Sequence, residues 1–367
     1  MSVGTLMTLI GVLTLGGGQD VKKPAGVAGP AEAEKRAAVA GFPQPPRAQL
    51  APGVHVKFPS ESEASLMLYR RDDFVDALSP FDRSARLATD EDVNVSRFVK
   101  FVSEQVIGWK PAEIQKLYRS IAGVREKLAP FEVSFPKEII FIKTTGKEEG
   151  QAAYCRKNAV VIPAHYLTRP AKSLEKLLLH ELFHIHSSHQ PAEARDRLYS
   201  ILGFRPCGDI GVPRWLDRRR ITNPDAPRIR HRLVVTVDGE STSVVPFLYS
   251  SKAKYDKSLG GRFFKYLVFR LMVVEQKGGR WVSKLVDGKP ILLAPEKVPD
   301  FGKQIGENTQ YTIHPEEVLA DNFVLLVSGA EKVRTPRIID ELRRVFRRQE
   351  PQSPRISETK SQEAKPR

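Results

Sequence analysis

One helix, within residues 170–188, constrains this sequence more than any other stretch, because it carries His180 and His184. Its apolar side chains recur at the i, i+4, i+7 spacing that buries one face of a helix: Leu178, Leu182 and Ile185. Residues four apart share a face, with Cβ atoms about 6 Å apart, so both imidazoles can reach one metal ion. The sequence therefore predicts a helix that is buried on one side and presents two histidines on another.

Glu181 lies beside the first histidine and completes the pattern H-E-x-x-H, which occurs in zinc hydrolases. Its carboxylate can stand next to a water that the metal activates and take a proton from it. The alternative is that His180 and His184 are core residues, since three fixed positions in five residues also recur by chance. A third ligand would favour the metal site.

A second helix supplies candidates for that ligand. Pro315, an acidic first turn and the apolar run 318–327 mark its start, and Glu317 and Asp321 share one face. Glu317 can complete a His₂Glu zinc site, while Asp321 can accept a hydrogen bond from a ligating imidazole. There are two alternatives: Glu317 is only a helix-capping acid, or His314 is the third ligand in its place.

The two motifs together resemble the gluzincin metallopeptidases, the clan of thermolysin, in which H-E-x-x-H is followed downstream by E-x-x-x-D. The stretch 317–321, E-V-L-A-D, is closest to the E-x-x-A-D of CaaX-processing and stress-response membrane peptidases. The resemblance covers two short helices and implies His180, His184 and Glu317 as zinc ligands. It also implies Glu181 as general base and Asp321 as a hydrogen-bond partner of a ligand.

Gluzincins often place a Tyr or His beyond the third ligand to stabilise the oxyanion, but no Tyr or His follows Glu317 here. Candidates upstream are Tyr311 and His314, with His231 and the arginines of 214–232 as weaker ones. For Tyr311, a packed aromatic ring is the alternative.

Two further histidines, His186 and His189, are interpreted as surface or rim residues. A metzincin site would need Gly and His where this chain has Ser187 and Gln190.

The order of the elements predicts an α+β fold with a small sheet, an active-site helix, a third-ligand helix and a β-rich insertion. Helical patterns come first and strand patterns follow, at 93–109, 111–128, 138–142, 152–155 and 159–162. A sheet followed by the H-E-x-x-H helix resembles a zincin catalytic half in its arrangement. That resemblance implies that the strand at 159–162 is the sheet edge to which an extended peptide adds.

The predicted domain organisation has four parts. Residues 1–18 are a signal peptide or N-terminal anchor, since an apolar run is followed by small residues, although no basic segment precedes it. Residues 19–59 form an Ala/Pro-rich linker, 60–348 the metallopeptidase domain with an insertion at about 230–300, and 349–367 a disordered basic tail. We expect a secreted, periplasmic or cell-envelope protein, with a cytoplasmic location as the alternative.

Cys155 and Cys207 are the only cysteines, too few for a disulfide scaffold or a cysteine-based zinc module. They form one disulfide if the protein is exported, or are two unpaired thiols. The formal charge of +15 is concentrated in 214–232 and 343–367. These segments match no nucleic-acid-binding motif, so we interpret them as solvated surface capable of weak contact with anionic surfaces.

The sequence thus predicts a zinc-dependent endopeptidase that acts on a peptide or protein substrate. One alternative is a catalytically inactive metal-binding or peptide-binding protein of the same fold. Another is a binder of anionic polymers through the basic segments, whose affinity would fall steeply with salt.

Overall fold

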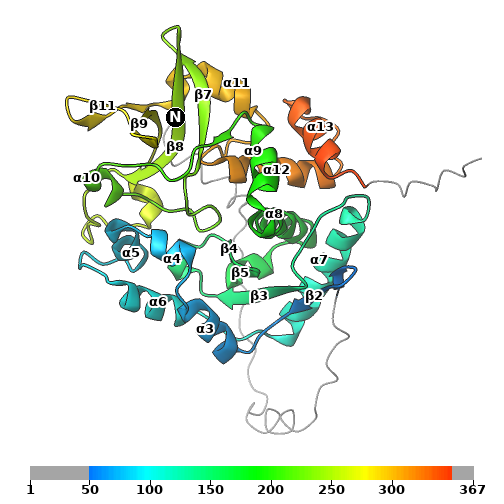
Figure 1. Cartoon of the computed structure of the whole chain (residues 1–367). Coiled ribbons are helices and arrows are strands. Elements are labelled where there is room, and N and C mark those ends of the chain that lie inside the picture. Colours follow the sequence, from blue (N-terminus) through cyan, green and yellow to red (C-terminus); the bar gives the residue numbers. More distant parts are fainter. Residues whose placement is uncertain (1–48, 349–367) are drawn as a thin grey trace, which may run out of the picture.

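A five-stranded sheet lies on one side of the helix that carries the two histidines (Figure 1). The computed structural model describes residues 49–348. The strand order is β1 (Gln49–Ala51), β2 (Val54–Lys57), β3 (Glu138–Thr144), β5 (Ala159–Pro163) and β4 (Tyr154–Arg156). Strands β2, β3 and β5 are parallel, and β4 runs antiparallel to β5 at the edge.

Helices cover both faces of this sheet. Ile139 and Phe141 of β3 pack into the cluster that contains the apolar faces of α7 (Pro111–Leu128) and α8 (Ala171–His189). The alternate residues Ile140 and Ile142 pack against a cluster from the opposite side. That side is formed by α3 (Glu61–Tyr69), α4 (Asp73–Ala77) and α6 (Val95–Ser103). Helix α5 (Pro80–Arg86) lies between α4 and α6 in the sequence. Burial on both faces explains the uninterrupted apolar run of β3.

Helix α12 (Pro315–Val327) packs against α8, and α13 (Pro336–Val345) packs against α12. The predicted apolar face of α8 is confirmed, because Leu178, Leu182 and Ile185 are at most 1% exposed. The shorter helices α9 (Ala192–Ser200), α10 (Arg214–Asp217) and α11 (Pro299–Ile305) lie between α8 and α12 in the sequence. Short 3₁₀ turns occur at Lys147–Glu149, Ala164–Thr168, Phe263–Tyr266 and Pro295–Lys297.

The predicted β-rich segment forms a second, antiparallel sheet, which lies above the first sheet in the view of Figure 1. Its order is β10 (Arg280–Ser283), β9 (Leu267–Lys277), β8 (Glu240–Ser250), β7 (His231–Val237) and β6 (Arg205–Pro206), with β13 (Leu292–Leu293) also on β9. Strands β11 (Leu285–Val286) and β12 (Lys289–Pro290) form a separate hairpin. A tight turn joins β7 to β8, and its central residues Asp238 and Gly239 have the positive φ that such a turn requires, 51° and 84°. The α+β class is confirmed.

Two expectations from the sequence are wrong. The linker was expected to reach residue 59, but 49–57 form β1 and β2, because Val54 and Val56 are buried on one side while β2 pairs with β3. The strand at 159–162 was expected at the sheet edge, but β5 lies between β3 and β4, so β4 is the edge. Residues 1–48 and 349–367, which include the predicted signal or anchor, most of the linker and the basic tail, lie outside the described residues.

Within residues 49–348, no helix has the length and apolar character needed to cross a bilayer. Cys155 and Cys207 are both free thiols, and Cys155 is buried.

Candidate metal centre

His180 and His184 extend from α8 toward the first turn of α12, where Glu317 meets them. The Nε2 atoms of His180 and His184 lie 3.3 and 3.7 Å from Glu317 Oε2. One ligand atom from each residue lies within 4.8 Å of the others. The structure therefore brings together the three ligands that the sequence predicted from two separate motifs.

The chemistry of these donors fits a tetrahedral metal ion. Bonds of about 2.0–2.1 Å place neighbouring ligand atoms about 3.3 Å apart, close to the spacing found here. His184 Nε2 is buried and has no hydrogen-bond partner, which is costly for an imidazole nitrogen. A cation between His180, His184 and Glu317 would satisfy it.

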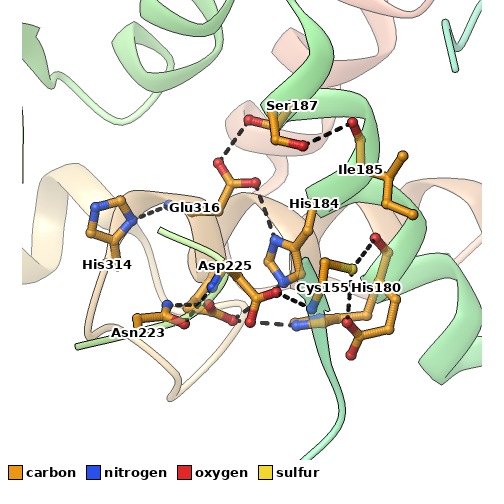
Figure 2. Close-up of polar contacts among 12 residues, drawn as sticks. Cys155, His180, His184, Ile185, Ser187, Asn223, Asp225, His314 and Glu316 are labelled. Carbon is orange, nitrogen blue, oxygen red and sulfur yellow. Dashed lines mark hydrogen bonds and ion pairs between the residues drawn. The ribbon is translucent and has the colours of Figure 1, made fainter. Parts of the chain in front are cut away.

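The second ring nitrogen of each histidine faces a carboxylate. His180 Nδ1 lies 3.1 Å from Asp321 Oδ1, which is the contact that the sequence analysis expected of Asp321. His184 Nδ1 lies 3.1 Å from Glu316 Oε1 (Figure 2). Carboxylates at Nδ1 leave Nε2 of both rings available as a metal ligand and fix the orientation of each ring.

Sequence reasoning missed the role of Glu316. This residue is 2% exposed, and its other oxygen accepts hydrogen bonds from Ser187 Oγ at 2.8 Å and Tyr199 Oη at 2.6 Å. Its position beside Glu317 was the only indication in the sequence, and an acid in the first turn of a helix is commonly explained by the helix dipole. Glu316 instead connects His184 with Ser187 of α8 and Tyr199 of α9.

Neighbouring opposite charges determine the protonation of the three candidate ligands. Burial raises the pKa of Glu317, but His184, His180 and a hydrogen bond from Asn223 outweigh it and bring the value to about 2. Burial lowers the pKa of His184, but Asp225, Glu317 and Glu316 raise it to about 9. The pKa of His180 is also well above its usual value, since Asp321 and Glu317 outweigh burial. In the absence of a cation, protons on the histidines balance the carboxylates.

Glu181 is buried next to the three ligands and 3% exposed. Burial raises its pKa above the usual value of a carboxyl, although the two histidines oppose that shift. The Cys155 thiol donates to Glu181 Oε2 at 3.2 Å, and burial keeps that thiol protonated by raising its pKa. Cys155, Glu181 and Asp225 form a second cluster whose ligand atoms lie within 4.8 Å of one another.

The loop that contains Asn223 and Asp225 reaches both clusters. Asn223 Nδ2 donates to Glu317 Oε1 at 2.6 Å, and Asp225 Oδ1 accepts a bond from the backbone N–H of Cys155 at 2.7 Å (Figure 2). The sequence analysis interpreted this stretch only as a loop. Nothing in its local pattern distinguishes it from other Pro-containing loops.

Of the oxyanion candidates, Tyr311 has surroundings that include carboxyl groups of both clusters. Burial, followed by the charges of Glu317 and Asp225, raises the pKa of its phenol well above 10, so it is a hydrogen-bond donor at neutral pH. His314 begins α12, and its Nδ1 accepts a bond from the backbone N–H of Glu316 at 3.1 Å. Burial lowers the pKa of His314 to about 4, and its ring belongs to neither cluster.

The weaker candidates have other partners. His231 Nε2 lies 2.7 Å from Asp196 Oδ1. Arginines of 214–232 contact groups outside the two clusters, namely Arg219, Arg220, Arg228, Arg230 and Arg232.

The interpretation of His186 as a surface residue is wrong, whereas His189 is exposed as expected. His186 is 6% exposed, and its Nδ1 lies 2.9 Å from the carbonyl oxygen of Ser134. His186 follows His184 by two residues, so it points to another face of α8, where its ring packs against the ring of Phe346.

No protein-family model, curated protein or solved structure matches this chain. The functional argument therefore depends on the geometry and chemistry of the site.

Proposed function

We propose that this protein is a zinc-dependent endopeptidase of gluzincin type, built on a zincin-like core, with a peptide or protein substrate. One observation carries the proposal: His180, His184 and Glu317 converge from two helices, and the convergence leaves His184 Nε2 buried without a hydrogen-bond partner. Structural histidines in a core normally have their polar atoms satisfied.

His180, His184 and Glu317 would hold the zinc ion. When bound, Zn²⁺ would lower the pKa of a water molecule and polarise a carbonyl group of the substrate. Asp321 and Glu316 would orient the two imidazoles through Nδ1, and Asn223 would hold Glu317 through Oε1, leaving Oε2 for the metal.

Glu181 is the proposed general base. Its burial raises its pKa above the usual value of a carboxyl, which suits a group that first accepts a proton from water and then delivers it to the leaving amine. The Cys155 thiol holds its Oε2 in place. Tyr311 is the proposed oxyanion donor, since its phenol remains protonated among the carboxylates of the site.

The test is hydrolysis of a quenched-fluorescence peptide library and of an unfolded protein by the full chain, before and after treatment with a chelator. We expect cleavage that the chelator abolishes and added zinc restores. A protein that binds one zinc and binds peptides without any turnover would contradict the proposal and support the inactive binding protein. Binding of anionic polymers that is unaffected by the chelator would instead support the second alternative, a binder of anionic polymers.

Glu316→Gln is expected to weaken zinc binding by about 10–100-fold, because a neutral amide polarises the His184 ring less than a carboxylate does. The measurement is zinc affinity by competition with a fluorescent chelator. Glu341→Gln, a change of the same type on the exposed face of α13, is the control and should leave the affinity unchanged. Equal affinities for the two variants would show that Glu316 has no influence on the metal.

Zinc affinity should fall as the pH is lowered from 9 to 6. His184 has a pKa of about 9 in the metal-free protein, so below that pH zinc must displace a proton from it. One such proton costs about tenfold in apparent affinity per pH unit, and the raised pKa of His180 steepens the dependence. Competition titrations at each pH, corrected for protonation of the chelator, measure this slope. A flat profile would show that the histidines are not the ligands.

A further inference from the structure

The loop of residues 222–228, which we call the strap, is fixed at both ends. At its start, Thr222 donates its backbone N–H to Asp82 at 3.1 Å, and its carbonyl accepts a bond from Arg86 at 2.9 Å. Asp82 and Arg86 form an ion pair whose side chains are fully buried. At its end, Arg228 forms an ion pair of 3.0 Å with Asp73. The strap therefore has a fixed path between two anchors.

Along this path the strap blocks the free edge of β4. A two-residue turn joins β4 to β5, so Arg156 and Ala159 form the hydrogen-bonded pair next to it. Cys155 and Val160 then form the non-hydrogen-bonded pair, and the backbone N–H of Cys155 points away from the sheet. Asp225 accepts this N–H at 2.7 Å. Its carboxylate thus takes the place that the carbonyl of an added strand would occupy.

The strap also contacts the proposed metal site. Asn223 donates to Glu317, and the backbone N–H of Asp225 donates to Asn223 Oδ1 at 3.1 Å, which fixes the direction of the amide. The Asp225 carboxylate lies in the same cluster as Glu181. The strap therefore spans the distance from the third ligand to the edge strand, which is the space that a peptide lying along β4 toward the metal would need.

We propose that the strap is a built-in competitor of the substrate, and that Asp225 must leave the edge of β4 before an extended peptide can add there as another strand. This inference rests on the proposed function, and it adds a closed state to it. Peptides that add to a sheet edge gain affinity from main-chain hydrogen bonds, and Asp225 removes the N–H donor that β4 offers nearest to Glu181. Release of the strap exposes that donor.

The first test is peptide binding by zinc-loaded protein in which Glu181→Gln prevents turnover. A fluorescently labelled extended peptide should bind the Glu181→Gln, Asp225→Ala double variant about tenfold more tightly than Glu181→Gln alone. The control is Asp300→Ala in the same background, because Asp300 also accepts a strand N–H, that of Thr236 at 2.9 Å, away from the site. Equal affinities with and without Asp225 overturn the proposal, as does the absence of binding by every variant.

The second test needs no peptide hydrolysis or binding. Hydrogen exchange at the Cys155 amide should accelerate in Asp225→Ala, and unchanged exchange overturns the proposal. These results are separate from the proposed function, which stands or falls on zinc content and chelator-sensitive cleavage by the protein without substitutions.

Discussion

Replacing Glu181 by Gln will lower kcat/KM for peptide hydrolysis by about 10²–10⁴-fold, the usual contribution of a general base. The substitution preserves the size of the side chain and the acceptor for the Cys155 thiol, but an amide takes no proton from water. Because Glu181 is not one of the three ligands, zinc content should stay at one ion per chain. Steady-state kinetics on a cleaved peptide, with elemental analysis of the same preparation, measure both quantities.

The matched control is Glu175→Gln, on the same helix but at the ion pair with Lys127. We expect it to leave kcat/KM unchanged, since solvent screens such a pair and it lies outside both clusters. If Glu181→Gln hydrolysed the peptide as fast as the protein without substitutions, Glu181 would have no role as base.

His184→Ala is expected to lose zinc. The substitution removes a ligand whose other nitrogen is held by Glu316, and a loss greater than the 100-fold or so typical of a ligand's hydrogen-bond partner should follow. It also leaves the Glu317 carboxylate buried with one cation fewer beside it. Elemental analysis after dialysis, together with competition titration, measures the loss.

Three companion variants define which donors bind. His189→Ala removes an exposed histidine of the same helix and should retain zinc. His180→Ala and Glu317→Ala should lose it, as His184→Ala does. Retention of zinc by Glu317→Ala would contradict the ligand set and return His314 to consideration as the third ligand.

The local periodicities carried most of the information about the site. Because the α-helix has a fixed pitch, the spacing of His180 and His184 determines that they share a face, and the same argument pairs Glu317 with Asp321. The apolar face of α8 and the class of the fold followed from equally local patterns. His186 shows the limit of that reasoning, since being a polar residue did not place it on the surface.

The order of strands in the first sheet could not be derived in the same way. The pairing of β5 with β4 is a local hairpin, but the parallel pairing of β5 with β3 depends on the path of the chain, and β2 pairs with β3 across a gap of some 80 residues. Pairing partners distant in sequence leave little trace in a local pattern. The Ala/Pro-rich composition before residue 49 therefore concealed where the fold begins.

The sequence by itself predicted the two helices, the three candidate donors and the candidate base beside them, because each pattern depends on spacing within one helix. Tertiary structure alone decided which groups hold these residues in place. Asn223 reaches Glu317 across 94 residues, and Asp225 reaches the Cys155 backbone across 70. Glu316, although adjacent to Glu317, acquires its role only when α12 packs on α8. Such contacts depend on the packing of whole elements, which no local spacing encodes.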